Sequence, residues 1–273
     1  MEQGAGSRKI VAFDARGAHE REDTLAVEAP LEIRVGGQSV SVTMRTPGHD
    51  TELAAGFLFT EGVLTKRDEL VSIAMSGAHE GTVEIEVTDT VLPRLRRLVR
   101  HVYAASSCGI CGKASVDAVR TLHGVDLDDP RLITPDEILA LPARLRDAQR
   151  IFETTGGLHA AGLFDAAGEL VTLREDVGRH NAVDAIVGER FLAGALPLTG
   201  HALLVSGRAS FELVQKAAAA RIPVFLAVGA PSTLAVELAD EVGMTLVGFL
   251  RDGRFNVYAG DERIASRTSL REP

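Results

Sequence analysis

The sequence predicts an α/β protein with a smaller α+β unit at its N-terminus. From Phe152 onward, short apolar runs alternate with helix-like segments. This alternation is typical of parallel strands whose faces are covered by helices. In the first 105 residues, strand-like runs are instead combined with two helix-like segments. The chain has 273 residues, enough to bury a sizeable core as one large domain or two smaller ones.

The region from residue 1 to 105 is predicted to be the α+β unit. The residues up to about Glu22 are polar and are expected to be irregular. Two alternating runs in "APLEIRVGGQSVSVTMRTP" meet at Gly36-Gly37 and predict a hairpin. "HDTELAAGFLFTEG" predicts a helix with Asp50 at its N-cap. "GTVEIEVTD" predicts a strand, and Leu92 to Tyr103 a basic helix.

The region from residue 134 to 273 is predicted to be the α/β domain. Its first helix carries a capping-box pattern, with Thr134 at the cap, Pro135 first and Glu137 third. Two strand-like runs then meet at a turn near Asp165. Helix-like and strand-like segments follow in alternation before a turn at Asp252-Gly253: GRHNAVDAIVGERFLAG, HALLVS, ASFELVQKAAAARI, PVFLAVG, PSTLAVELADEVG and MTLVGFL.

Composition and charge exclude several classes of protein. The formal net charge of -9 argues against a general duplex-binding surface, although one local basic pocket stays compatible with it. Aromatic residues make up 4% and tryptophan is missing, so stacking platforms for single-stranded nucleic acid are not expected. No run approaches the roughly 18 apolar residues of a membrane span. With no secretory signal at the start and two cysteines in all, a cytoplasmic location is expected.

Both cysteines, Cys108 and Cys111, lie in "AASSCGICGKAS", within a segment from residue 106 to 133 that is predicted to be a mobile cysteine loop and connector. A thiolate with an unperturbed pKa of about 8.5 is the reactive form, and Lys113 or a helix start nearby can lower that pKa. A structural zinc site needs four ligands, and neither a second C-x-x-C nor a His-x(3–5)-His pair occurs. A sulfur carrier, a redox pair and two incidental small residues in a turn remain open.

Histidine and charged residues gather in two further segments. "TGGLHAAG" invites comparison with zinc deaminases, whose signature is H-x-E before P-C-x-x-C. Here Ala161 replaces the glutamate and Ser107 the proline, so deaminase chemistry is excluded while a deaminase-like scaffold stays open; His159 is equally compatible with a structural role. "REDVGRHNAVD" predicts either a binding site or a capped helix with a solvated face, with these candidate residues: Arg174, Glu175, Asp176, Arg179, His180, Asn181 and Asp184.

Two strand-to-helix turns, "LLVSGRASFE" and "LAVGAPSTLA", are candidate phosphate sites. Backbone N–H groups at a helix start, together with Ser206, or Ser232 and Thr233, can hold phosphate oxygens. Arg208 adds a bidentate donor. Neither turn matches the P-loop or G-x-G-x-x-G pattern, and ordinary capped turns explain each equally well.

Taken together, five segments in order resemble the formate dehydrogenase accessory sulfurtransferase family, FdhD, over nearly the whole chain from about Asp23 to the last strand. These segments are "SSCGICGKAS", "FETTGGLHAAGLFD", "REDVGRHNAVDAIVG", "LLVSGRASFELVQKAA" and "GAPSTLAVELADEVGMTLVGFLRDGRFNVY". The resemblance implies a cytidine-deaminase-like core and a homodimer. It also implies a sulfurtransferase that takes persulfide sulfur from a cysteine desulfurase.

In that family the sulfur passes to the molybdenum, or tungsten, of a bound bis(molybdopterin guanine dinucleotide) cofactor, which formate dehydrogenase requires. Carried over, the resemblance implies that Cys108 bears the persulfide and that Cys111 assists or resolves its transfer. It implies cofactor contacts from one further segment: Phe249, Leu250, Arg251, Asp252, Gly253 and Arg254. A non-catalytic cofactor chaperone for formate dehydrogenase and a disulfide reductase are the competing hypotheses.

Overall fold

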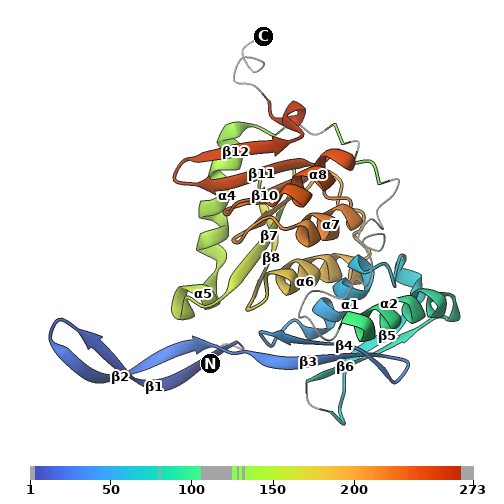
Figure 1. The fold of residues 1–273 in the computed structure, drawn as a ribbon, viewed down its shortest axis with the longest axis horizontal. Helices are drawn as coiled ribbons and strands as arrows, with labels where there is room; N and C mark the ends of the chain where they lie inside the picture. Colours follow the sequence, from blue (N-terminus) through green and yellow to red (C-terminus); the bar gives the residue numbers. More distant parts are fainter. Residues whose placement is uncertain (1–3, 80, 106–124, 128, 131–132, 266–273) are drawn as a thin grey trace.

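The computed structural model describes residues 4–79, 81–105, 125–127, 129–130 and 133–265. These described residues form three separate sheets (Figure 1). A six-stranded sheet forms the centre of the larger α/β part, a four-stranded sheet belongs to the N-terminal part, and a two-stranded ribbon begins the chain. The predicted α/β class with a smaller N-terminal α+β unit is therefore confirmed.

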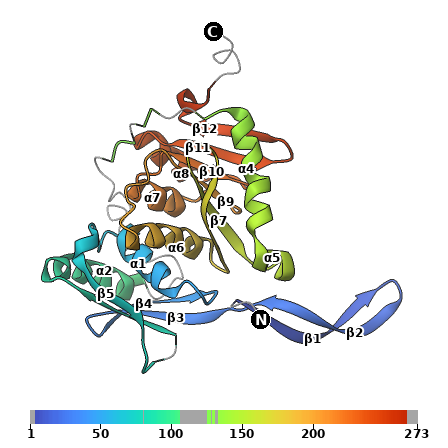
Figure 2. The same cartoon turned by 180° about the vertical axis from the view of Figure 1, so that it is seen from behind.

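The six-stranded sheet has the order β12-β11-β10-β9-β7-β8 and lies between two helical layers (Figures 1 and 2). Its strands are β7 (His159–Phe164), β8 (Leu170–Asp176), β9 (Ala202–Val205), β10 (Val224–Ala227), β11 (Thr245–Arg251) and β12 (Arg254–Ala259). Strands β9, β10 and β11 are parallel, as the alternation predicts. Strand β7 pairs antiparallel with β8 and β9, and β12 pairs antiparallel with β11.

Alternate residues of these short strands build two hydrophobic cores, one on each face. Leu203 and Phe225 pack on the side of α6 (Arg179–Leu192), α7 (Phe211–Ala219) and α8 (Thr233–Glu241). Leu204 and Leu226 pack on the opposite side against α4 (Pro135–Ala148). Because both faces of the strands are buried, their sequences are continuously apolar rather than alternating.

Helix α4 begins as predicted. The Thr134 hydroxyl accepts a hydrogen bond from the Glu137 backbone at 3.2 Å, and a Glu137 carboxylate oxygen accepts one from the Thr134 backbone at 2.6 Å. The helix ends at Gln149, after which the short α5 (Arg150–Thr155) follows. The capping box thus fixes the start of the helix whose other end, at Gln149, reaches the pocket described below.

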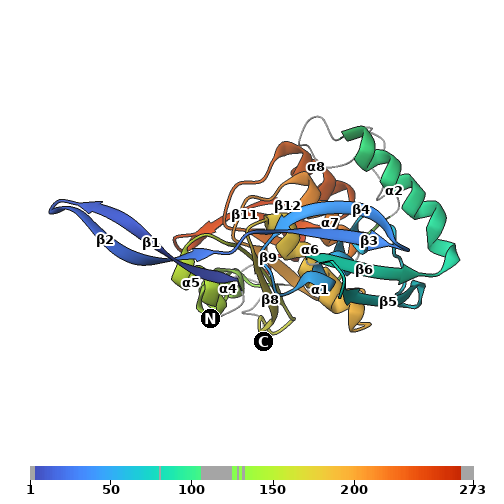
Figure 3. The same cartoon turned by 90° about the horizontal axis from the view of Figure 1, so that it is seen from below.

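The N-terminal sheet has the order β4-β3-β6-β5 and is covered by α1 and α2 (Figure 3). Its elements are β3 (Ala29–Val35), β4 (Gln38–Arg45), α1 (Asp50–Thr60), β5 (Leu70–Met75), β6 (Thr82–Val87) and α2 (Leu92–Ala105). The hairpin predicted at Gly36-Gly37 is confirmed. The predicted cap is wrong by one residue, since His49 is the N-cap and Asp50 opens the helix. The Asp50 carboxylate accepts from the Arg45 guanidinium and from the Gly48 backbone instead.

Helices α1 and α6 join the two parts at a very close crossing. A methyl group added to Gly56 would lie 1.8 Å from the carbonyl oxygen of Asp184. Beside this crossing, the buried ammonium of Lys216 donates to both carboxylate oxygens of Asp184, each at 2.9 Å, and to the Thr60 hydroxyl at 2.9 Å. Glycine and a fully hydrogen-bonded ion pair therefore hold the N-terminal unit against the α/β part.

The first strands contradict the sequence prediction. Instead of an irregular segment, β1 (Ala5–Asp14) and β2 (Gly17–Ala26) form a long antiparallel ribbon that extends away from the rest of the chain (Figures 1 to 3). Most of its side chains are exposed, and Phe13 is 80% exposed. Because neither face is buried, no alternation of polar and apolar residues marks these strands in the sequence.

Within the described ranges, no helix is long and apolar enough to cross a membrane.

Candidate functional site

The carboxyl ends of β9, β10 and β11 meet at one edge of the central sheet, and the amino ends of helices gather there. Helices α7 and α8 have Ser210 and Ser232 as N-caps, directly after β9 and β10, and α6 has Gly178. Crevices outside the carboxyl ends of parallel strands are where open α/β sheets bind ligands. The two turns predicted as phosphate sites, with Ser206 and Arg208 in the first, thus lie side by side, joined by a bridge between Ala209 and Pro231.

Two histidines and an arginine lie at this edge. His159 starts β7, and a methyl group added to Gly207 would lie 3.7 Å from its Nδ1 and 3.8 Å from Cδ of Arg179. Burial, followed by the positive charges of Arg179 and His180, lowers the pKa of His159 below its ordinary value. His180 Nε2 lies 2.8 Å from a Glu212 carboxylate oxygen. Nε of Arg179 is buried and has no hydrogen-bond partner in the described structure.

Some residues of the charged segment "REDVGRHNAVD" make structural contacts between elements, and others lie at this sheet edge. Asp176 accepts hydrogen bonds from the backbone of Thr46 at 2.9 Å and of Gly178 at 2.7 Å. Burial outweighs these bonds and raises the pKa of Asp176 above its ordinary value. Arg174 pairs with Glu52 at 2.7 Å. These residues, like the buried Asp184, hold neighbouring elements together.

Two members of the segment have other roles. Glu175 accepts from the backbone nitrogens of Ile151 at 3.0 Å and Phe152 at 2.8 Å, and so caps the start of α5. His180 lies on the first turn of α6 at the sheet edge. The segment therefore caps α5 and fastens neighbouring elements. The hypothesis of a binding site stays a prediction, with Arg179 and His180 at the carboxyl edge of the sheet.

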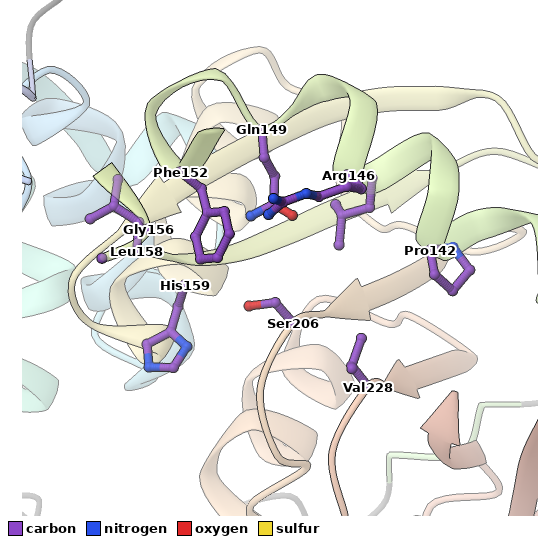
Figure 4. Close-up of a pocket in the computed structure, with 11 residues that line it drawn as sticks. Pro142, Arg146, Gln149, Phe152, Gly156, Leu158, His159, Ser206 and Val228 are labelled. Carbon is purple, nitrogen blue, oxygen red and sulfur yellow. The ribbon is translucent and has the colours of Figure 1, made fainter. Parts of the chain in front are cut away.

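A pocket of about 470 Å³ opens beside this edge, between the end of α4, the short α5 and the first residues after β9 and β10. Figure 4 shows Arg146, Gln149 and Phe152 extending from the helical side, with His159, Ser206 and Val228 on the strand side. Pro142, Leu145 and Leu158 add apolar lining. A mainly apolar hollow with a few polar groups is typical of a small-molecule site.

The polar groups of the pocket come from both sides. The Arg146 guanidinium carbon lies 4.4 Å from the centre of the Phe152 ring. Gln149 is only 6% exposed. The Ser206 hydroxyl accepts from the backbone of Ala160 at 2.9 Å, which leaves its proton to be donated elsewhere. Of these groups, the sequence prediction found only Ser206 and His159.

A signal for Gln149 was present in the sequence. Leu141, Leu145 and Gln149 follow at intervals of four, which puts a polar residue on the apolar stripe of α4. Leu141 and Leu145 are buried in the core. Gln149, at the end of this stripe, is buried in the same way and lines the pocket.

The segment from Phe249 to Arg254, expected to contact the cofactor, spans the end of β11, the turn at Asp252-Gly253 and the first residue of β12. Phe249 has φ of +53°, a left-handed conformation that is rare for a bulky residue. Its backbone nitrogen donates to the Gly229 carbonyl at 3.0 Å, one residue after Val228 of the pocket wall. Arg251 and Arg254 are exposed, as are Asp252 and Gly253 between them.

Leu250 differs from its neighbours, because its side chain is 1% exposed and packs in the core shared with α4. Only its backbone can face a ligand. The roles of the whole segment remain predictions. Cys108 and Cys111, and with them most of the predicted cysteine loop, lie outside the described residues. Across the described ranges, no group of three or more His, Cys, Asp or Glu side chains could hold a metal ion.

Comparisons with known proteins agree over nearly the whole chain. The sulfur carrier protein FdhD of Streptomyces avermitilis is 55% identical, covering 96% of each chain. The protein of the same name from Sulfurisphaera tokodaii is 38% identical, covering 94% of this chain and 98% of its own.

A solved structure and a family model point the same way. The crystal structure of a protein described as a formate dehydrogenase accessory protein from Desulfotalea psychrophila has a TM-score of 0.74 and 26% identity, covering 96% of this chain and 100% of that one. The model of the FdhD/NarQ family matches residues 26–265. The chain belongs to the FdhD/NarQ family.

Proposed function

We propose that the protein carries sulfur from a cysteine desulfurase to the molybdenum, or tungsten, of a bis(molybdopterin guanine dinucleotide) cofactor required by formate dehydrogenase. The names of the relatives, sulfur carrier protein and formate dehydrogenase accessory protein, support the general role. The observation that carries the specific proposal is that the pocket lies beside the sheet edge where Arg179 and Arg208 are found. The phosphates of a dinucleotide could bind at the sheet edge, and its planar base could enter the pocket.

The sheet edge suits the phosphates of this substrate. The amino ends of α6, α7 and α8 bring the positive ends of three helix dipoles to one side of the sheet. Arg179 and Arg208 add two guanidinium groups there. A protein with a net charge of -9 can thus concentrate positive potential locally for a phosphorylated ligand.

The thiol chemistry is proposed for Cys108 and Cys111. The Cys108 thiolate attacks the outer sulfur of the donor enzyme's persulfide, the donor's sulfur–sulfur bond breaks, and the donor leaves as a thiolate. The Cys111 thiolate then attacks Cys108, so that a disulfide forms and the outer sulfur leaves as sulfide with the two electrons. A cellular dithiol reductant restores both thiols. The enzyme is thus a sulfurtransferase with a persulfide intermediate, expected to act as a cytoplasmic homodimer.

Mass spectrometry after incubation with a cysteine desulfurase and cysteine tests the proposal. The wild-type protein should gain the mass of one sulfur atom, and Cys108→Ala should not. Cys111→Ala should still be loaded, but should release its sulfur slowly. The chaperone hypothesis predicts instead that the double variant Cys108→Ala, Cys111→Ala still supports active formate dehydrogenase, and a disulfide reductase would turn over a dithiol substrate. An unloaded wild type would refute the carrier proposal.

A further inference from the structure

Helix α2 carries a dense basic segment that the proposed function does not use. The residues from Arg94 to Arg100 include four arginines, and the whole helix contains no aspartate or glutamate. The chain has a formal net charge of -9, so this helix is opposite in sign to the protein as a whole. A local region of opposite charge attracts partners that the remaining surface repels.

The helix is packed so that one side of it faces water. Leu95 and Leu98 are buried in the core of the N-terminal unit, together with residues of α1. Arg96 and Arg97 lie between them in the sequence and are exposed. Figure 3 shows α2 at the outer surface of the N-terminal unit, far from the ribbon. The helical period therefore separates an apolar side, which is covered, from a basic side, which is accessible.

Arg94 holds the helix in this orientation. Its guanidinium donates to a Glu69 carboxylate oxygen at 2.5 Å and to the Thr65 hydroxyl at 2.9 Å. The Glu69 carboxylate also accepts from the Thr65 backbone nitrogen at 2.7 Å. The charge of Arg94 is thus paired within the fold, whereas Arg96 and Arg97 present their guanidinium groups on the exposed side.

The end of α2 leads directly to the two cysteines. The helix ends at Ala105, and Cys108 follows three residues later. Three residues of extended chain span at most about 11 Å. Along the helix axis, Arg97 is about 12 Å from Ala105, at a rise of 1.5 Å per residue. A partner that exchanges sulfur with Cys108 must bring its own sulfur atom to that thiol, so chain length alone brings the partner close to α2.

We propose that the exposed basic side of α2, defined by Arg96 and Arg97, is the docking surface for the sulfur-donating enzyme, which meets it with an acidic surface. The inference rests on the proposed function, because the donor is the cysteine desulfurase named there. Charge complementarity of this kind speeds encounter and orients the partner.

Two other anionic partners fit this surface less well. A nucleic acid duplex requires many phosphates to be neutralised, and the acidic remainder of the chain would repel it. A helix that lies on a membrane buries its apolar side in the lipid, whereas Leu95 and Leu98 are already buried in the protein core. A protein with a local acidic surface satisfies both observations.

Sulfur loading of the full chain by the cysteine desulfurase tests the docking surface. At about 0.05 M salt, the double variant Arg96→Glu, Arg97→Glu should be loaded with a kcat/KM about tenfold or more below that of the wild type, because charge reversal replaces attraction by repulsion. The difference should shrink at about 0.5 M salt, where charges are strongly screened. Arg96→Lys, Arg97→Lys keeps both charges and should be loaded like the wild type.

Two controls separate docking from damage to the thiol. Neutral iodoacetamide needs no docking surface, so it should alkylate Cys108 at the same rate in the wild type and in the Arg96→Glu, Arg97→Glu variant. Arg8→Glu, Arg16→Glu makes the same change of charge on the ribbon, at the far side of the molecule from α2, and should be loaded normally (Figures 1 and 2). An equal loss in either control, or normal loading of the α2 variant, would overturn the inference.

Binding to the immobilised desulfurase, measured by biolayer interferometry, lets the two proposals fail separately. The wild type should bind, and Arg96→Glu, Arg97→Glu should bind about tenfold or more weakly. A wild type that is loaded with sulfur, beside a variant that binds and is loaded equally well, refutes the docking surface and leaves the carrier role standing. Arginine-dependent binding without any sulfur loading refutes the carrier role and supports the docking surface.

The same variants distinguish the other classes of partner. Neither duplex DNA nor phosphatidylserine vesicles should bind the wild type more tightly than the Arg96→Glu, Arg97→Glu variant. Arginine-dependent binding to either of them, with binding to the desulfurase unchanged, would assign the basic side of α2 to that partner and overturn the inference.

Discussion

Gly188 of α6 lies directly against Gly56 of α1: a methyl group added to Gly188 would be 2.6 Å from the Gly56 backbone nitrogen and 1.8 Å from the Glu52 carbonyl oxygen. The obstacles are backbone atoms, which cannot turn aside. Gly188→Ala should therefore destabilise the protein by about 3 kcal/mol, although alanine is the better helix former. Gly77→Ala, where a methyl group would meet nothing within 4 Å, should change stability by less than about 0.5 kcal/mol. Urea unfolding of the two variants checks this, and a Gly188→Ala protein as stable as the wild type would contradict the close crossing.

Removing one partner of the buried Lys216–Asp184 pair should destabilise the protein strongly, whereas replacing both partners by apolar residues should change its stability little. The carboxylates of Asp184 and Glu61 outweigh burial and raise the pKa of Lys216, so its ammonium is charged in the folded state. Lys216→Met leaves Asp184 buried without its cation and should cost about 3–5 kcal/mol. The double variant Lys216→Met, Asp184→Leu should recover most of that loss. Arg21→Ala, which removes an exposed ion pair of the ribbon, should cost less than about 1 kcal/mol in the same denaturation experiment.

Glu52 should contribute to the acid sensitivity of the fold. Burial alone would raise its pKa, but hydrogen bonds from His49 and Arg174 outweigh burial and leave the pKa below the ordinary value of 4.5. The unfolded state therefore takes up a proton first, so this contribution is present above pH 4.5 and is lost as the pH falls through the folded value. Glu52→Gln should be less stable than the wild type at pH 7, and the two stability curves should converge in acid.

The control for this pH profile is Glu86→Gln, which removes an exposed carboxylate of β6. Its stability curve from pH 7 into the acid range should run parallel to that of the wild type. A Glu52→Gln curve that is also parallel to the wild type would mean that the pairing with Arg174 does not favour the ionised carboxylate.

At Phe249, the glycine variant should be more stable than the alanine variant, which is the reverse of the usual order. At φ of +53°, every residue with a Cβ is strained, so Phe249→Gly should be more stable than Phe249→Ala by about 1 kcal/mol. Phe255 on β12 has no positive φ, and there the alanine variant should be the more stable one, by about 0.5–1 kcal/mol. Thermal unfolding of the four variants measures both differences. The same order at both positions would show that the strained backbone at Phe249 is absent in solution.

The elements that could be predicted from the sequence are those with at least one buried face or with a local capping pattern. The strands β9 and β10 are apolar on both faces, and the capping box of Thr134 and Glu137 is a purely local pattern, so each leaves its own mark in the sequence. The ribbon of β1 and β2 has no such pattern in its sequence, because both of its faces are exposed to water. Asp50 has the right chemistry for a cap, but the Arg45 guanidinium engages its carboxylate, which only the tertiary structure decides.

The pocket is harder to predict for a related reason. Arg146, Gln149 and Phe152 belong to one stretch of chain, but their meaning depends on Ser206 and Val228, which the sheet brings to the opposite wall. The resemblance directs attention to the segment from Phe249 to Arg254, where the exposed arginines lie, and gives no reason to consider the end of α4. A polar residue on the apolar stripe of that helix was the available clue.

The ribbon of β1 and β2 gives the protein two separable stabilities. Its amide hydrogens are shielded by one ladder of hydrogen bonds, and a two-stranded hairpin is marginally stable by itself. Deuterium should therefore replace them through brief local openings, long before it reaches β9 and β10, whose amides wait for the whole core to open. Gly188→Ala should speed hydrogen exchange in the core strands and leave exchange in the ribbon unchanged. One exchange experiment therefore measures the local stability of the ribbon and the global stability of the core separately.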